Sequence, residues 1–246
     1  MIRPALALVL LLAACTNGSP DPAPSASPSP TPSASPTLTP EQLDLARLAN
    51  KVVTSRYDAV YVFEAPATRD VGSLRILASP PNYPVDITNR GSTSIFIVTA
   101  ARTVSCSITP QNKRSCFLVA RAGEEIPDLF DPGVQHLFSD AVADLGKNPM
   151  AYQVTRTPNV RLPGGLPDGY CFDVRRVDPI AGEDPVGFET GRYCIAERGV
   201  LTQLSVTTGR ITLKKLGPPP AAAQFNPIAP VAALPDLSPK PKPSAS

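Results

Sequence analysis

The residue type best suited to catalysis occurs once in the 246 residues, as His136. Ser139 and Asp140 follow it three and four positions later, which on a helix would place their side chains beside the imidazole. A serine nucleophile also needs a strained turn and donors for the oxyanion, and this stretch predicts neither. Since no spacing of acidic residues singles out a carboxylate pair, we expect no catalytic residue and no enzyme. His136 is interpreted as a solvated residue on a helix face.

Composition narrows the classes of partner. The chain carries 23 Lys and Arg against 21 Asp and Glu, so its formal net charge of +2 leaves no cationic surplus for a phosphate backbone. We therefore expect no nucleic-acid partner. One histidine excludes multi-histidine metal sites, and Gly164-Gly165 lacks the strand-to-helix context of a phosphate-binding loop. We expect neither a metal nor a cofactor.

The N-terminus indicates export. Residues 1–14 carry one arginine and then a short apolar run, which is too short to span a bilayer and is typical of a signal peptide. Leu12-Ala13-Ala14-Cys15 resembles the lipobox of bacterial lipoproteins, in which the cysteine is diacylated and becomes the first mature residue. We predict a lipid anchor (palmitate or a similar chain) at Cys15 that holds the protein on the extracytoplasmic face of the cell membrane. An ordinary secretory peptide is the alternative.

Four cysteines remain when Cys15 is set aside, an even number in a chain predicted to reach an oxidising compartment. We therefore expect two disulfides. Cys106 and Cys116 flank a polar turn, and Cys171 and Cys194 flank a longer loop, so a local pairing across each hairpin is favoured. A zinc site built from all four thiolates is the alternative, although no C-x-x-C pair is present to chelate the metal.

Proline and serine set both ends of the chain apart from its middle. Residues 15–40 form a Pro/Ser-rich tract that cannot bury enough apolar surface to fold, which predicts a tether. Residues 218–246 are also rich in proline and are interpreted as a C-terminal tail. The folded domain is therefore predicted over residues 41–217, which is long enough for one substantial core.

The domain alternates helix signals with groups of strand signals. Thr39 and Gln42 fit a capping box around Pro40, so we predict a helix that ends near Ser55. Segments rich in β-branched and aromatic residues follow, separated by short polar breaks that suit hairpins. We predict an α+β fold with one continuous antiparallel meander and helices gathered on one face. The predicted strands cover 57–65, 72–79, 82–89, 92–100, 102–109, 115–121, 151–157, 169–177, 191–198, 200–208 and 209–216.

A second helix is predicted between the two groups of strands. Asp131 would cap it, Pro132 would begin it and Gly146 would end it. Its apolar residues fall on one stripe that is expected to face the sheet. The stripe consists of Val134, Leu137, Phe138, Ala141 and Leu145.

A lipobox, a Pro/Ser tether, the strand YDAVYVFEA after a helix, the VSC…SC hairpin and the FDP helix start occur here in one order. Over about residues 41–216 this order resembles actinobacterial-type lipoproteins of the LolA/LppX/LprG-like superfamily. The resemblance implies a curved antiparallel sheet, a half-open barrel, that wraps two or more helices on one face. It also implies a lipid or glycolipid ligand between sheet and helices, which the stripe residues would line.

Three functions stay open, in declining order. The first is an envelope carrier or binder of lipids, and the second is a sensor or interaction module for another envelope protein, like the RseB-like proteins that are similar to these carriers. The third is an enzyme with a cryptic site. The sequence leaves open whether the stripe lines a cavity or packs directly against the sheet in a closed core.

The tail carries a pattern of its own. Five apolar residues recur every three positions, which is the period of polyproline II, and would form one stripe that docks on the domain's sheet, a ligand-entry mouth or a partner. Chance spacing in a disordered tail is the alternative. The five residues are Phe225, Ile228, Val231, Leu234 and Leu237.

Overall fold

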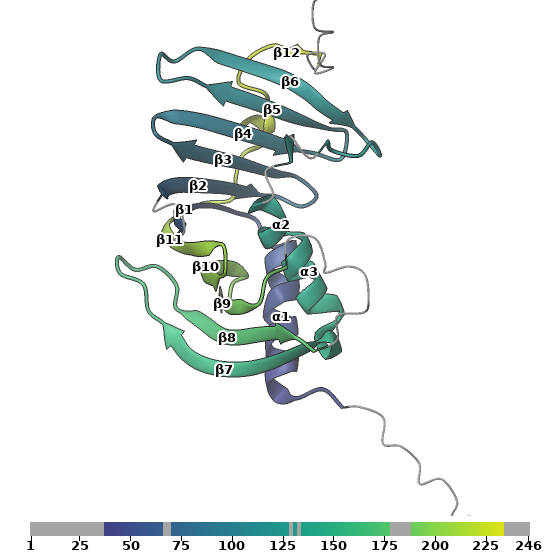
Figure 1. The fold of residues 1–246 in the computed structure, drawn as a ribbon, viewed down its shortest axis with the longest axis vertical. Coiled ribbons are helices and arrows are strands. Elements are labelled where there is room, and N and C mark those ends of the chain that lie inside the picture. Colours follow the sequence, from purple (N-terminus) through teal and green to yellow (C-terminus); the bar gives the residue numbers. More distant parts are fainter. Residues whose placement is uncertain (1–36, 66–69, 128–129, 132–133, 178–187, 234–246) are drawn as a thin grey trace, which may run out of the picture. The chain divides into compact units, whose positions relative to one another are not determined.

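The computed structural model describes residues 37–65, 70–127, 130–131, 134–177 and 188–233 (Figure 1). The predicted signal peptide, Cys15 and most of the tether lie outside the described residues, as do Leu234 and Leu237. Within the described ranges, no helix is both long enough and apolar enough to cross a membrane.

The first helix, α1 (Pro40–Thr54), begins at the predicted capping box. The Gln42 amide donates to Thr39 Oγ1 at 3.2 Å, and the Thr39 amide donates to Gln42 Oε1 at 2.8 Å. The box thus satisfies two backbone donors that the helix itself cannot pair. The Gln42 side chain also donates to the carbonyl oxygens of Pro149 and Tyr152 at 3.2 and 2.8 Å, which fixes the start of α1 against the second half of the chain.

Every segment predicted as a strand forms one, with small shifts at the ends. A twelfth strand, β12 (Val231–Ala232), comes from the predicted tail and pairs parallel to β6, whereas the other strand pairs are antiparallel. The eleven predicted strands are β1 (Tyr57–Ala65), β2 (Asp70–Ala78), β3 (Tyr83–Asn89), β4 (Ser92–Val98), β5 (Arg102–Ile108), β6 (Arg114–Arg121), β7 (Tyr152–Val160), β8 (Gly169–Arg176), β9 (Gly191–Ala196), β10 (Val200–Val206) and β11 (Gly209–Gly217).

The strands form one open sheet in the order β12-β6-β5-β4-β3-β2-β1-β11-β10-β9-β8-β7. The prediction of one continuous meander is wrong, because two meanders, β1–β6 and β7–β11, are joined through the β1–β11 pair. After β6 the chain passes through the helical segment and begins again at β7, the other edge of the sheet. Hairpin signals predict which neighbours pair, but they carry no information about where the second meander attaches.

The predicted second helix is broken into two. The short helix α2 (Val134–Phe138) ends before Ser139, and α3 (Asp140–Lys147) follows, then a 3-10 turn, η2 (Pro149–Ala151). Ser139 has φ −111° and ψ −73°, and its carbonyl accepts from Ala143 at 2.8 Å. Serine favours helix caps over helix interiors because its hydroxyl competes for backbone groups, which is consistent with a break at this residue.

Two apolar clusters lie on opposite faces of the sheet, each over part of it. The larger cluster joins the three helices to side chains of β1, β2, β3 and β7 to β11. The smaller cluster contains side chains of β4, β5 and β6 together with residues of the tail. Figure 1 shows α1 and α3 beside β7 to β10, and the helices are not spread along the whole sheet. The α+β class is thus seen as a long open sheet with few helices, while a sheet that wraps the helices stays a prediction.

Both predicted disulfides are present. Cys106 pairs with Cys116 across the β5–β6 hairpin, and Cys171 pairs with Cys194 across β8 and β9. In each case the two cysteines lie directly opposite one another in the strand register. All four thiols are therefore used within the sheet.

Candidate functional site

Four of the five residues predicted to line a lipid cavity belong to the larger apolar cluster. Leu137, Phe138, Ala141 and Leu145 are between 0 and 8% exposed. The Phe138 ring lies 5.1 Å from the ring of Tyr61 on β1, so α2 packs directly on the sheet at this point. Val134 is in α2, and its side chain lies outside the described residues. The burial of these four residues is that of a packed core, and a cavity between sheet and helices stays a prediction.

His136 is held between two carboxylates and is not the solvated side chain that the sequence predicted. Its Nε2 lies 2.7 Å from Asp131 Oδ2, and its Nδ1 contacts Asp140 Oδ2, while the His136 side chain is only 16% exposed. The hydrogen bond to Asp140, followed by the bond to Asp131, raises the pKa of His136 to about 9. At neutral pH both ring nitrogens therefore carry protons, which suits an ion-pair clamp and not a general base.

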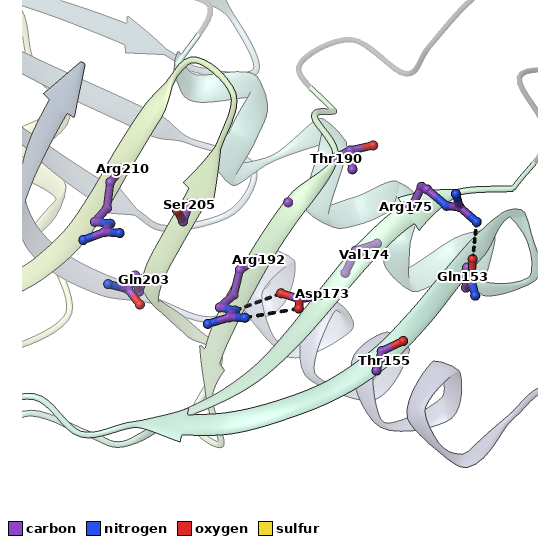
Figure 2. Close-up of a pocket in the computed structure, with 11 residues that line it drawn as sticks. Gln153, Thr155, Asp173, Val174, Arg175, Thr190, Arg192, Gln203, Ser205 and Arg210 are labelled. Atoms are coloured by element: carbon purple, nitrogen blue, oxygen red, sulfur yellow. Dashed lines mark hydrogen bonds and ion pairs between the residues drawn. The ribbon is translucent and has the colours of Figure 1, made fainter. Parts of the chain in front are cut away.

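A polar hollow of about 660 Å³ lies elsewhere, over β7, β8, β9, β10 and β11. Three arginines line it, together with one carboxylate and several amides and hydroxyls (Figure 2). We call it the arginine hollow. Its lining residues are Gln153, Thr155, Asp173, Val174, Arg175, Thr190, Gly191, Arg192, Gln203, Ser205 and Arg210.

Strand alternation places this hollow on the face of the sheet opposite the helices. Tyr193, Leu204 and Ile211 belong to the helix-containing core. Their chain neighbours Arg192, Ser205 and Arg210 must therefore point to the other face, because successive side chains of a strand alternate. We call this face, which the helices leave uncovered, the outer face.

The register gathers the polar residues into one row across the strands. Thr155 is opposite Asp173, Asp173 is opposite Arg192, and Arg192 is opposite Ser205. Ser205 is in turn opposite Arg210, and Glu64 of β1 follows Arg210 along the same row. Cross-strand neighbours have Cβ atoms about 5 Å apart, so the two guanidinium groups of this row flank a serine hydroxyl.

Two of the three arginines donate hydrogen bonds to other lining residues of the hollow. Arg192 donates to both carboxylate oxygens of Asp173, at 2.8 and 3.1 Å, and this pair raises the pKa of the guanidinium. Arg175 donates to the side-chain oxygen of Gln153 at 2.5 Å. Within the described residues the Arg210 side chain makes no hydrogen bond and no ion pair. The hollow thus offers pre-positioned donors on two strands and one guanidinium whose donors are unused.

Charge is concentrated in the hollow. Its lining carries three guanidinium groups and one carboxylate, a local charge of +2, which equals the formal net charge of the whole chain. Planar guanidinium groups bind carboxylates and phosphates through paired hydrogen bonds. In the part of the chain that is described, no group of three or more His, Cys, Asp or Glu side chains could hold a metal ion. The arrangement is suited to binding an anion.

Sequence reasoning missed this site. Arg192 and Arg210 each lie between a glycine and an apolar residue, and Arg175 lies between Val174 and Arg176, so the local pattern indicates only the solvent side of a strand. The formal net charge of +2 did not reveal them, because a sum over 246 residues does not show where the positive charges lie. Only the register of five strands brings the three side chains to one hollow.

Comparison with known proteins does not identify a family for this chain. No protein-family model and no curated protein matches the chain. Among solved structures, it is similar to the crystal structure of MucB, at 14% identity and a TM-score of 0.49, over 76% of this chain and 63% of that chain. The complex structure of Pseudomonas aeruginosa MucA/MucB matches at 13% identity and a TM-score of 0.43, over 74% and 60%. The chain covers less than two thirds of either solved chain. Since both TM-scores are below 0.5, neither likeness decides the fold or the function.

Proposed function

We propose that this chain is a lipid-tethered module on the extracytoplasmic face of the membrane that binds an acidic segment of another envelope protein. The single observation behind the proposal is the arginine hollow, with three guanidinium groups against one carboxylate on an uncovered face of the sheet. The sequence adds the export signal and the lipobox cysteine, Cys15, which would keep the module at the membrane.

The geometry favours a carboxylate-bearing ligand of extended shape. The hollow spans five strands, so its donors are distributed along a surface and do not converge on one point. Arg210 and Arg192 lie on β11 and β9, with β10 between them. Two carboxylates of one peptide could therefore each meet a guanidinium, and the amide of Gln203 and hydroxyl of Ser205 could bond the peptide backbone.

Binding of a hexaglutamate peptide to the chain made without its lipid tests the proposal. We expect Arg175→Gln with Arg210→Gln to weaken binding at least tenfold at low salt while leaving the melting temperature unchanged. The matched control is Arg102→Gln with Arg114→Gln, which removes the same charge from β5 and β6. Equal weakening by both double variants would show that net charge alone is sensed, and would refute the site.

A lipid carrier is the second candidate, and one observation favours it. The core that contains the helices includes no described side chain of β4, β5 or β6. Phe96 and Phe117 are partly exposed and lie on the helix side of these strands, each opposite Ser105. An acyl chain would bind along these residues and not beneath the second helix, where Leu137 and Phe138 already pack.

Native mass spectrometry of the protein purified without Cys15 separates the two candidates. A co-purified lipid that is lost on Phe96→Ser with Phe117→Ser supports carriage. A clean protein mass together with hexaglutamate binding supports the interaction module.

A further inference from the structure

The predicted tail is part of the fold as far as residue 233. From the end of β11 it crosses the outer face, passing β2, β3 and β4, and reaches the edge strand β6 (Figure 1). We call residues 218–233 the strap. It includes a 3-10 turn, η3 (Ala222–Phe225), and β12, so it is not one polyproline helix.

Register shows which face the strap covers. Asp86 of β3 lies between Val85 and Ile87, which pack in the helix-containing core, so Asp86 points to the outer face. Ile95 is opposite Asp86, Cys106 is opposite Ile95, and Cys116 is opposite Cys106. The smaller apolar cluster is therefore on the outer face of β4, β5 and β6.

Three aliphatic side chains of the strap, those of Ile228, Ala229 and Val231, pack on this surface. Ile228 and Val231 pack on the cluster, which contains Ile95, Ile97, Val104, Cys106 and Cys116. These are two members of the predicted every-third-residue stripe. Phe225, a third member, is partly exposed and is not part of the cluster.

Backbone pairing with the sheet holds the strap at Val231 and Ala232. Its only strand pairing among the described residues is β12, in which Val231 and Ala232 lie beside Cys116 and Phe117. Ala221, Ala222, Ala223, Gln224, Asn226 and Pro230 are exposed. An edge strand with unpaired amides and carbonyls accepts further strands readily, and among the described residues β6 is such an edge apart from Cys116 and Phe117.

The strap also leaves space beneath it. A hollow of about 190 Å³ lies between the strap and the sheet, and its apolar floor is formed by Leu77, Ile95 and Ile97. Arg75 and Asp86 line its polar side, and Arg75 is itself bound to both carboxylate oxygens of Asp58 at 2.9 and 2.7 Å. The strap contributes only small or polar groups besides Ile228, namely Ala223, Gln224 and Asn226.

We propose that the β6 edge and the apolar surface of β4 and β5 form an acceptor site for an extended peptide, which the chain's own strap occupies in the absence of a partner. The partner is a segment of another protein with the strap's spacing of two aliphatic residues three apart, followed by strand-forming residues, and with a large apolar side chain in place of Ala223. Strand addition to a sheet edge, with pockets for alternate side chains, is a general mode of peptide recognition.

Competition with the strap explains why the partner must fill the hollow. A segment attached to the same chain acts at an effective concentration of about a millimolar, so an identical peptide from outside does not displace it at lower concentration. Leu77, Ile95 and Ile97 are only 3 to 8% exposed, so a larger side chain in place of Ala223 gains mainly van der Waals contacts with them inside the hollow. This inference is independent of the arginine hollow, which lies on other strands.

The test uses the full chain without its lipid and a labelled peptide of residues 218–237. We expect the unmodified peptide to bind at least tenfold more tightly to a chain carrying Ile228→Ser and Val231→Ser than to the unmodified chain, since the substitutions loosen the strap. A peptide carrying Ala223→Phe should bind the unmodified chain, and protection of β6 amides against hydrogen exchange should be retained on binding. A peptide with both serine substitutions is the control and should not bind.

Two results would overturn the proposal. One is a doubly substituted chain that stays folded and binds neither peptide. If that chain does not fold, failure of the Ala223→Phe peptide to bind the unmodified chain at millimolar concentration is decisive. Retained hexaglutamate binding in either case leaves the arginine hollow unaffected.

Discussion

The outer faces of the two meanders differ although one sheet carries both. Over β7 to β11 the outer face carries arginines, amides and hydroxyls beside the Cys171–Cys194 disulfide, and the helices leave it uncovered. Over β4 to β6 it carries isoleucine, valine and a disulfide, and the strap covers it. The side chains explain why one surface is covered and the other is not. Moving apolar side chains out of water lowers the free energy, whereas covering charged side chains would remove their hydration.

The two regions also differ in the packing on their inner face, the face of the sheet on which the helices lie. The helices supply a thick core to β7 to β11 and to β1 to β3. The strands β4 to β6 receive no described side chain from that core, so the strap is their main apolar cover. The difference teaches that one region can leave its outer face free for binding because its inner face supplies the stability, whereas the other region needs its outer face for folding.

The largest expected effect on the free energy of unfolding comes from removing the disulfides. On the chain-entropy estimate, replacing Cys171 and Cys194 by alanine should lower the free energy of unfolding by about 3.4 kcal/mol, and replacing Cys106 and Cys116 by about 2.7 kcal/mol. The loops they close span 23 and 10 residues. Urea unfolding of the two double variants measures this difference. A larger loss for the β5–β6 pair would show that the strapped region depends on its disulfide more than loop length explains.

Removing the strap should affect one region only. A chain ending at Gly217 loses the packing of Ile228 and Val231, which should cost about 2 to 3 kcal/mol because both side chains are only partly buried. We expect hydrogen exchange to accelerate in β4, β5 and β6 and to stay unchanged in β8 and β9. Uniform acceleration in both regions would mean that the two halves unfold together, and the comparison above would be wrong.

The ion pairs of His136 with Asp131 and Asp140, which we call the His136 clamp, lie in the helical segment between the two meanders. The folded pKa of about 9 lies above the ordinary value near 6.5, so its stabilisation is complete below pH 6.5 and is lost as pH rises through 9. We expect His136→Asn to cost about 2 kcal/mol at pH 6, less than the shift alone implies because Asp140 is 55% exposed, and to cost little at pH 10. Denaturant unfolding of both proteins across this range gives the result. A cost that does not change with pH would contradict the clamp.

The smallest effect on stability is expected in the arginine hollow. Arg210→Gln should change the free energy of unfolding by less than about 0.5 kcal/mol, because the side chain is exposed and has no partner in the described part of the chain. Ile97→Gln, at an apolar position of the strapped surface, is the contrasting variant and should destabilise by about 2 kcal/mol or more. Thermal melts of the two variants decide whether the two outer faces have different roles.

Local chemistry was sufficient to predict the first helix and eleven of the strands from the sequence. The Thr39–Gln42 capping box, the strands enriched in β-branched and aromatic residues and the symmetric placement of Cys106 and Cys116 all depend on residues close in the chain, and each is present in the structure. Cys171 and Cys194 are also paired as predicted, since one connection separates their strands. The export signal and the anchor at Cys15 stay predictions.

The tertiary structure alone decided where these elements meet. Attachment of β11 to β1 joins the two meanders, and the registers of β9 with β10 and of β10 with β11 align Arg192, Ser205 and Arg210 in one row. The same is true of the strap, whose residues Ile228 and Val231 are spaced by three in the sequence but find their surface more than a hundred residues away. Pairing between distant strands depends on packing against the whole sheet, and a sequence specifies that packing only through the fold as a whole.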